Sequence, residues 1–375
     1  MSDSVALVRV DDAVRAYDFG VSHPLRPERV LYTYDRIREL GLDRLAHVTA
    51  VDSRSASTDE ITAVHDPLFV EAVRGIDDGH LERWAGIEFG LGTADNPIFA
   101  DMHDAAAAVS GASIVAAEAV CSGRAQHAFN PAGGLHHARR SEASGFCIYN
   151  DPAVAIGRVL ELNPSWRVMY VDVDVHHGDG VQWIFYDEPR VLTLSLHQSG
   201  ATLYPGTGFT DEIGDGEAAG TSANVPFEPG TEEDDYLWAL ERVLRPLAAA
   251  FKPDVLFSQL GADTHHGDPL ANLSLTMRAY PRIAALLHSA AHEFANGRWI
   301  ATGGGGYQAT TVVPKVWTMH FAEMCGTPEA VPEDWARDRA PHSLSSASTR
   351  RVEASVARLL DLCVSRLSAI STPAP

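Results

Sequence analysis

The sequence predicts an α/β fold with a mainly parallel sheet, and three observations support this. Short apolar runs rich in β-branched residues alternate with longer helix-like segments, a pattern typical of a parallel sheet covered by helices on both faces. The chain has 375 residues, 45% of them hydrophobic, and can therefore bury a large core. No internal repeat or low-complexity linker divides it, so we expect a single domain over residues 1–375.

Four short runs are predicted to be buried strands. Each is rich in β-branched or other large apolar residues, and each is shorter than a typical buried helix. In chain order they are residues 167–175 (RVMYVDVDV), 190–197 (RVLTLSLH), 253–260 (PDVLFSQL) and 298–302 (RWIAT).

Helices are predicted mainly in the longer segments that precede or separate these strands. The last of them is amphipathic, and the residues after it, 371–375, are expected to be a frayed tail. The predicted helices cover residues 104–121, 151–161, 233–251, 277–295 and 350–369.

The charge balance restricts the partners of the protein. Lys and Arg total 29 against 50 Asp and Glu, a formal net charge of -21. Such a surface repels nucleic-acid phosphates and anionic lipids and favours cationic partners, although many acidic proteins carry this charge only for solubility. We therefore expect no nucleic-acid partner. The sequence does not indicate whether the protein is a monomer or an oligomer.

The protein is expected in the cytoplasm. Its four cysteines form no CxxC pair, and a chain of this length needs no disulfides. The N-terminal residues include Asp3, Asp11 and Asp12, where a secretory signal needs a basic start and an apolar run. No stretch reads as a membrane span.

A metal site is predicted in the segment VDVDVHHGDG. Alternation along a strand would place Asp172, Asp174 and His176 on one face, opposite a valine face. Carboxylate oxygen and imidazole nitrogen suit zinc, which usually takes three protein ligands in a catalytic site. Asp263, just past another predicted strand, is the best third ligand. The alternative is a structural network of ion pairs or helix caps.

A general base is predicted in the segment NPAGGLHHARRSEASGFCIYN. His136 and His137 follow a Gly-Gly pair in an expected loop, and an imidazole beside a metal-activated water can accept and then return a proton. Asp172 and Asp179 are the acids that could fix its tautomer. Two other adjacent histidine pairs in the chain show that pairing alone is weak evidence.

The segment TGGGGYQ follows the last predicted strand. Its glycines allow the backbone to bend back and present Tyr307, whose phenol could donate a hydrogen bond to an oxyanion. A phosphate-binding loop is the competing interpretation. The segment matches neither the P-loop nor the dinucleotide-binding pattern, and the acidic chain disfavours it.

These segments together resemble the histone deacetylase family over nearly the whole chain. The motifs occur in order: SHPLRPERV, VHDPLFVEAV, GLGTADNP, GGLHHARRSEASGFCIYND, YVDVDVHHGDGVQ, LTLSLHQSG, YPGTG, LGADTHHGDPL and GGGGY. The resemblance is closest to the bacterial acetoin-utilisation deacetylases and the class I histone deacetylases; acetylpolyamine amidohydrolases are more distant. It implies an arginase-like fold with a central, mainly parallel eight-stranded sheet.

The resemblance implies a role for each residue of the expected centre. Zn2+ would be the metal, one ion per chain, with Fe2+ as the alternative in the cell. The implied zinc ligands are Asp174, His176 and Asp263, and the implied general base and acid is His137 with its partner Asp179.

Further residues complete the reacting centre in the family. The resemblance implies that His136, paired with Asp172, supplies electrostatic stabilisation and that Tyr307 polarises the substrate carbonyl. It also implies a K+ ion beside the zinc. Its matching positions are Asp172, Asp174, His176, Ser195 and Leu196.

The resemblance also implies a substrate tunnel. The carbonyl of Gly145 would accept the substrate amide N–H, and Phe146 and Tyr204 would form aromatic walls. Asp95 is matched with the aspartate at the rim, although GLGTADNP carries one residue more than the usual spacing. Arg29 is matched with the arginine of an internal acetate channel.

The sequence departs from the family in three respects. Tyr204 stands where class I members usually have phenylalanine, and His265 and His266 lie in a variable stretch and receive no role. No basic nuclear-import run is present, which favours a bacterial-type metabolic enzyme.

The expected activity is zinc-dependent hydrolysis of the acetyl amide of N-epsilon-acetyl-lysine in proteins, which releases acetate. The main alternative is deacetylation of an acetylpolyamine or another small cationic acetyl-amine on the same fold. Less favoured are a two-metal ureohydrolase and a non-catalytic module that binds acyl-lysine.

Overall fold

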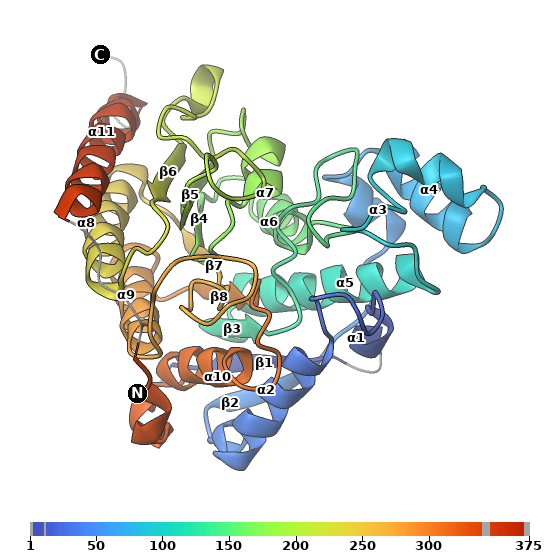
Figure 1. Cartoon of the computed structure of the whole chain (residues 1–375), viewed down its shortest axis with the longest axis horizontal. Helices are drawn as coiled ribbons and strands as arrows, with labels where there is room; N and C mark the ends of the chain where they lie inside the picture. The colour runs from blue at the N-terminus through green and yellow to red at the C-terminus, as the bar shows by residue number, and fades with distance from the viewer. Residues whose placement is uncertain (1–2, 11–12, 340–345, 371–375) are drawn as a thin grey trace.

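The structure is a computed structural model that describes residues 3–10, 13–339 and 346–370. Its centre is an eight-stranded sheet in the order β2-β1-β3-β8-β7-β4-β5-β6, and every neighbouring pair is parallel (Figure 1). The predicted α/β class is therefore confirmed. The strands are β1 Val5–Arg9, β2 Val48–Asp52, β3 His127–Asn130, β4 Val168–Asp172, β5 Val191–Gln198, β6 Ser222–Phe227, β7 Val255–Gln259 and β8 Trp299–Thr302.

The four predicted strands correspond to β4, β5, β7 and β8. The prediction was wrong at one end: β4 stops at Asp172 and does not continue through Val175. The reason is that Asp174 N–H donates to Asp172 Oδ1 at 3.1 Å and Val175 N–H donates to Asp263 Oδ1 at 2.9 Å. These backbone donors bind carboxylates instead of a neighbouring strand, so the chain bends.

Helices cover both faces of the sheet. The predicted helices are found within a few residues of their expected ends; the expected frayed tail, 371–375, lies outside the described residues. The α-helices are α1 Ala13–Ala16, α2 Glu28–Glu39, α3 Thr58–Thr62, α4 Pro67–Asp77, α5 Met102–Cys121, α6 Asp151–Leu162, α7 Asp179–Ile184, α8 Glu233–Phe251, α9 Ala279–Phe294, α10 Val313–Met324 and α11 Ser346–Ile370.

The sheet separates two hydrophobic cores. One core packs α2, α8, α9, α10 and α11 against the sheet, and the other packs α3 to α7 against the opposite face. Figure 1 shows α8, α9 and α11 on one side of the strands and α5 and α6 on the other. Because both faces are covered, β4 and β7 are buried along their whole length, as continuous apolar runs predict.

Helix α5 corrects the expectation that no segment could span a membrane. By length and composition it is long and apolar enough to cross a membrane. In the structure most of this helix is buried, and it packs against α6, β1 and β3. Its apolar character therefore fits a core helix.

The strand order determines where a site can form. Strands β3, β8, β7 and β4 are adjacent at the centre of the sheet and all run in the same direction. Their carboxyl ends therefore meet at one edge, where open parallel sheets bind ligands. The segments with unusual polar residues leave the sheet at this edge.

Candidate metal and catalytic site

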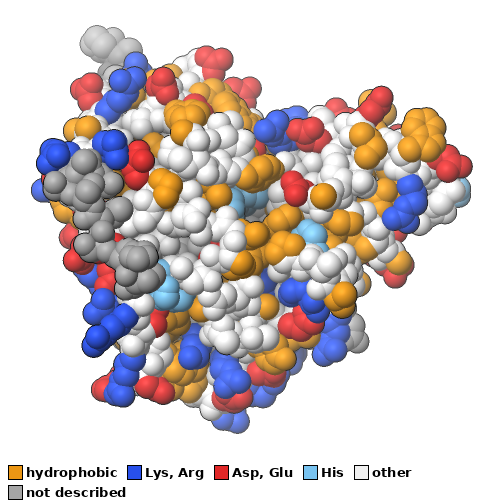
Figure 2. Space-filling view, viewed as in Figure 1, with side chains coloured by type: hydrophobic (Ala, Val, Ile, Leu, Met, Phe, Trp, Pro, Cys, Tyr) orange, Lys and Arg blue, Asp and Glu red, His pale blue; other side chains and the backbone are white. Residues whose placement is uncertain are grey.

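The site lies in the loops that follow β3, β4, β7 and β8. These loops carry His137, His176, Asp263 and Tyr307, and they surround a pocket of about 200 Å³. Figure 2 shows histidine side chains inside a hollow on this face, bordered by hydrophobic side chains. A narrow, largely apolar pocket with polar groups at its base is typical of a small-ligand site.

The three predicted metal ligands converge at the base of the pocket. Their ligand atoms all lie within 4.8 Å of one another, and all three side chains are buried. His176 Nδ1 is 3.1 Å from Asp174 Oδ1 and 3.2 Å from Asp263 Oδ2. Two carboxylates and one imidazole at these separations fit a single divalent cation.

The backbone fixes both carboxylates in place. Gly305 N–H and the Gln259 side-chain amide each donate to Asp174 Oδ2 at 2.7 Å, while Val175 N–H donates to Asp263 Oδ1. A methyl group at Gly305 would lie 2.0 Å from Asp263 Oδ2, so only glycine allows this close approach. One oxygen of each carboxylate remains directed at His176.

The charges of the three predicted ligands favour a cation between them. Burial alone would lower the pKa of His176, but Asp174 and Asp263 outweigh burial and raise it to about 10. Burial, and then repulsion from Asp174, raises the pKa of Asp263 to about 7. Two buried carboxylates at this distance need a cation between them, and the donor set suits a divalent metal.

Two histidine–aspartate pairs stand beside the three ligands. His136 Nδ1 is 2.7 Å from Asp172 Oδ2, and His137 Nδ1 is 2.7 Å from Asp179 Oδ1. The two Nε2 atoms are 3.2 Å apart. With Nδ1 hydrogen-bonded to a carboxylate, each ring directs Nε2 toward the site.

The two histidines differ in charge. For His136, burial opposes protonation, but Asp172 and Asp174 outweigh it and raise its pKa to about 9. For His137, burial and then the charge of His136 lower the pKa to about 4, despite Asp179. At neutral pH His137 is thus the unprotonated member and can accept a proton.

Tyr307 forms one wall of the pocket. Its ring centroid is 5.8 Å from that of Phe146 and 6.4 Å from that of His176. Its backbone N–H donates to Asp268 Oδ2 at 2.8 Å. Burial, and then the charges of Asp263 and Asp174, raise the pKa of Tyr307 well above its usual value. The phenol therefore stays protonated and can donate a hydrogen bond.

The predicted tunnel residues line the same pocket. Gly145 has a φ of 50° and Phe146 a φ of 71°, so both adopt left-handed backbone. A methyl group on Gly145 would lie 2.4 Å from the His137 ring. The ring of Tyr204 packs edge-on against the His137 ring, with 5.0 Å between the centroids, and Asp95 lies exposed at the rim.

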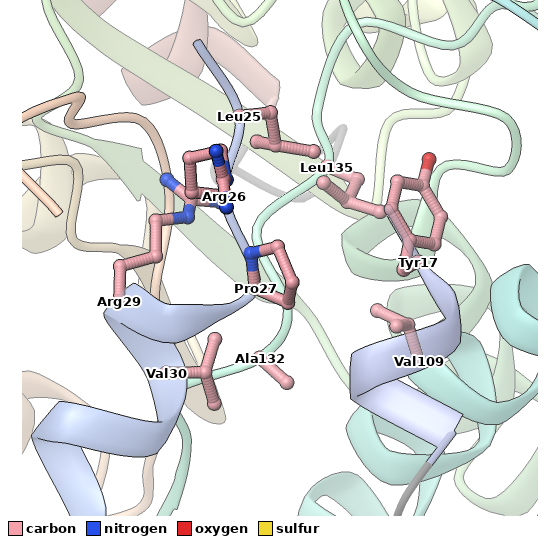
Figure 3. A pocket seen from close by; sticks show the side chains of 9 residues that line it. All are labelled: Tyr17, Leu25, Arg26, Pro27, Arg29, Val30, Val109, Ala132 and Leu135. Atoms are coloured by element: carbon pink, nitrogen blue, oxygen red, sulfur yellow. The ribbon is translucent and has the colours of Figure 1, made fainter. Parts of the chain in front are cut away.

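Arg29 lies beneath this pocket. It is buried, and its Nη1 donates to Gly304 O at 2.7 Å and to Gly306 O at 3.2 Å. It lines a small inner cavity of about 20 Å³ with Leu25 and Leu135, drawn in Figure 3. A second cavity of about 20 Å³ is lined by Arg29 together with His136, His137 and Tyr307.

Two of the residues matched to a monovalent-cation site, Ser195 and Leu196, lie on β5, the neighbour of β4. The register of β4 and β5 pairs Asp172 with Ser195, and Leu196 follows in β5. The Ser195 hydroxyl hydrogen-bonds His197 Nδ1 at 2.8 Å. Ser195 therefore lies beside one of the two histidine partners.

His265 and His266, which received no role, bond a common carboxylate. Their Nε2 atoms are 2.8 Å and 3.2 Å from Asp338 Oδ2, and Asp338 Oδ1 accepts the backbone N–H of Met277. These contacts tie the loop after β7 to the segment after α10. The pair therefore has structural partners outside the pocket.

Three positioning residues escaped the sequence analysis. Besides Gln259 and Asp268, Asp151 accepts the backbone N–H groups of Gly134 and Leu135 at 2.8–3.1 Å and thereby shapes the loop before His136. Asp151 is fully buried at the first turn of α6. The signal in the sequence was an acidic residue before an apolar helix, which reads equally well as an ordinary helix start.

Comparison with known proteins identifies the family. The histone deacetylase domain matches residues 23–324, most of the chain. The chain belongs to the histone deacetylase family. This membership supports a deacetylase function, places the protein among hydrolases and implies a metal cofactor.

Three similar proteins are bacterial. The acetoin utilization protein AcuC of Bacillus subtilis (strain 168) is 44% identical over 337 residues, covering 89% of this chain and 86% of the relative. The AcuC of Staphylococcus xylosus is 33% identical over the same shares. That of Staphylococcus aureus (strain MRSA252) is 35% identical over 84% of this chain and 81% of the relative. The resemblance to acetoin-utilisation deacetylases is thus confirmed.

Proposed function

We propose that the protein is a zinc-dependent deacetylase that hydrolyses the acetyl amide of N-epsilon-acetyl-lysine in proteins and releases acetate. The observation that carries the proposal is the neutral His137, whose Nδ1 is bound to Asp179, beside the converging ligand set in a narrow pocket. A module that only binds acyl-lysine needs no general base.

Asp174, His176 and Asp263 would hold the zinc. When bound, the ion supplies Lewis-acid chemistry, which polarises an acyl oxygen and lowers the pKa of a water molecule. One ion fits the three ligands; Fe2+ could occupy the same site in the cell. Asp172 Oδ2 is already bound by the imidazole of His136 and the hydroxyl of Tyr170, so this carboxylate cannot bridge two divalent ions through both oxygens, which disfavours a two-metal ureohydrolase.

His137 acts as the base and then as the acid. It is neutral at pH 7, so its Nε2 accepts the proton of the attacking water and later donates it to the leaving lysine amine. His136 stays protonated beside Asp172 and stabilises the negative charge that develops near it. Tyr307 donates a hydrogen bond from its phenol to the oxygen of the former carbonyl.

The pocket selects an unbranched amine chain. Phe146 and Tyr204 enclose the four-carbon stem of lysine, and the carbonyl of Gly145 accepts the amide N–H of the substrate. Asp95 at the rim accepts a hydrogen bond from the substrate backbone or attracts a cationic side chain beside the acetyl-lysine. Arg29 lies where released acetate would leave the centre, and its charge favours an anion there.

Further features belong to the same proposal. K+ would bind at Asp172, Asp174, His176, Ser195 and Leu196; the strand register that pairs Asp172 with Ser195 supports this. Residues 1–375 would be one deacetylase domain. The four free cysteines support a cytoplasmic setting, and the net charge of -21 supports cationic substrates over nucleic acids or membranes.

A substrate comparison tests the proposal. Chelator-treated protein is reloaded with Zn2+, and acetate release is measured for an acetylated protein, an acetyl-lysine peptide and an acetylpolyamine. We expect activity only after reloading and the highest kcat/KM with acetyl-lysine. A higher kcat/KM for the polyamine would assign the protein to the small-molecule alternative, and release of urea from a guanidine compound would refute the deacetylase proposal.

A further inference from the structure

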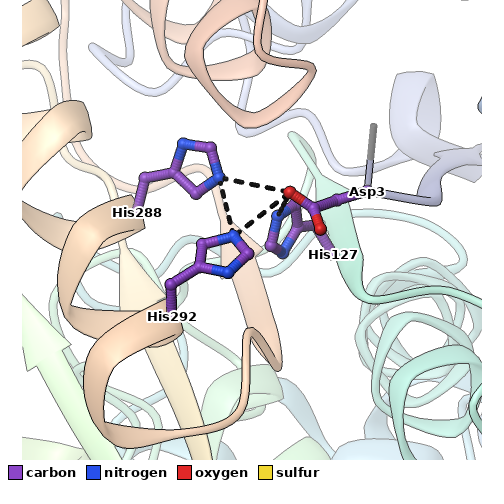
Figure 4. A group of neighbouring side chains, drawn as sticks. All are labelled: Asp3, His127, His288 and His292. Atoms are coloured by element: carbon purple, nitrogen blue, oxygen red, sulfur yellow. Dashed lines mark hydrogen bonds and ion pairs between the residues drawn. The ribbon is translucent and has the colours of Figure 1, made fainter. Parts of the chain in front are cut away.

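Four ligand-type side chains meet at the amino edge of the sheet, away from the pocket (Figure 4). Asp3 precedes β1, His127 begins β3, and His288 and His292 stand one turn apart on α9. The catalytic histidine loop leaves β3 at its carboxyl end. The cluster therefore lies at the opposite end of this strand and belongs to no part of the site described above.

The separations within the cluster match four ligands of one ion. His292 Nε2 is 3.2 Å from both His288 Nε2 and Asp3 Oδ2. Asp3 Oδ2 is 3.5 Å from His127 Nε2 and 3.9 Å from His288 Nε2. In a tetrahedral site with Zn–N bonds of about 2.0–2.1 Å, neighbouring ligand atoms are about 3.3 Å apart.

His127 supplies independent evidence for a ligand. Its side chain is fully buried, and neither ring nitrogen makes a hydrogen bond among the described residues; Nε2 only faces Asp3 Oδ2 at 3.5 Å. A buried imidazole without hydrogen bonds is destabilising unless something else binds it. The burial of His127 and its lack of hydrogen bonds therefore indicate a ligand at this position.

The surroundings orient the other ligands. His288 Nδ1 is 3.2 Å from Glu323 Oε1 on α10, which favours hydrogen on Nδ1 and leaves Nε2 free to bind a metal. The His288 ring also stacks on Trp299 at 5.7 Å. Because His292 follows His288 by four residues on a helix, the two rings lie on the same face.

We propose that Asp3, His127, His288 and His292 form a second metal site, which binds one Zn2+ and ties the segment before β1 to β3 and α9. Three imidazoles and one carboxylate suit zinc, and four protein ligands leave no open position for a substrate. The site is therefore structural. It holds the first described residue of the chain against two elements that are distant in sequence.

Zinc counting on the untagged, full-length protein tests the proposal. Metal-free protein is titrated with Zn2+, dialysed and analysed by mass spectrometry of the metal. We expect two equivalents in the wild type and one in His292→Leu. His292 is suitable because its side chain is 40% exposed, so the substitution leaves the core intact. His292→Cys restores a ligand and should retain both equivalents; His80→Leu, at a histidine side chain that is 81% exposed, is the matched control.

A second variant separates this site from the proposed active site. Asp263→Asn should lose the equivalent at the carboxyl edge but keep the one at the amino edge. Loaded with Co2+, this variant should show the visible absorption of a tetrahedral site, and the band should vanish when His292→Leu is added. A wild type with one equivalent that disappears in Asp263→Asn, or an unchanged zinc count in His292→Leu, would overturn the proposal. A single equivalent that disappears only in His292→Leu would instead count against zinc in the active site.

Discussion

Replacement of Asp179 by asparagine tests whether this carboxylate sets the tautomer of His137. Asp179 is fully buried, and its Oδ1 lies 2.7 Å from His137 Nδ1. The carboxylate can only accept, so Nδ1 carries the hydrogen and Nε2 is left as the acceptor. Asparagine has the same shape, but its amide can donate to Nδ1. The ring hydrogen then moves to Nε2 and blocks uptake of a proton.

The size of the effect follows from this geometry. In a histidine held by a buried aspartate, the wrong tautomer lowers kcat by about 10⁴, or roughly 5.5 kcal/mol at about 1.36 kcal/mol per tenfold. Asp179 Oδ2 also faces Arg139 Nη2 at 3.4 Å. Because Arg139 is 42% exposed, solvent screens its charge, and the loss of this contact adds less than the change of tautomer.

The assay is steady-state hydrolysis of an acetyl-lysine peptide, with zinc content measured on the same samples. We expect Asp179→Asn to lower kcat by about 10³–10⁴ with KM and bound zinc nearly unchanged. Glu142→Gln is the matched control, because Glu142 also binds Arg139, at 3.1 Å, without contacting His137. A kcat within tenfold of the wild type for Asp179→Asn would refute the assigned role of this pair.

Three further predictions concern single side chains. Tyr307→Phe keeps the ring contacts but removes the phenolic donor, so kcat should fall by about 10²–10³ with zinc retained; a loss below fivefold would exclude this donor. Tyr204→Phe removes a hydroxyl that bonds Ser144 on a ring that is 40% exposed. The kcat/KM should stay within about fivefold, and a larger loss would place that hydroxyl in substrate binding. His320 is buried, its ring nitrogens lack hydrogen-bond partners among the described residues, and burial lowers its pKa to about 3. Only the unfolded chain protonates this histidine below about pH 6.5, so the free energy of unfolding of the wild type should fall by about 2 kcal/mol more between pH 8 and pH 5 than that of His320→Leu. Urea unfolding at both pH values measures the difference. Equal falls in the two proteins would contradict the assignment.

The sequence was sufficient to predict the fold class and four of the strands, because β4, β5, β7 and β8 are short, apolar and rich in β-branched residues. It did not reveal β1, β2, β3 or β6. The sequence of β3, HAFN, begins and ends with polar residues, and it is a strand only because it pairs with β1 and β8. Such pairing is non-local and leaves no periodic pattern in so short a segment.

The candidate site was predictable for a related reason. Its ligands follow strands that could be recognised, and strand ends in a parallel sheet converge whatever the intervening helices do. The amino-edge cluster had no such signal. Asp3 and His127 lie far apart in sequence, and only the four-residue spacing of His288 and His292 on α9 indicated a shared face.

The carboxyl edge also explains how the fold tolerates acidic groups without solvent. Where β4 ends, the backbone N–H groups of Asp174, Val175 and His176 no longer pair with a strand and instead donate to carboxylates. These bonds compensate part of the lost hydration but leave the repulsion between Asp174 and Asp263, which contributes to the raised pKa of Asp263. A divalent ion relieves that repulsion, so its binding free energy adds to the stability of the native state. Metal affinity and the stability of the central loops are therefore coupled through the same two carboxylates.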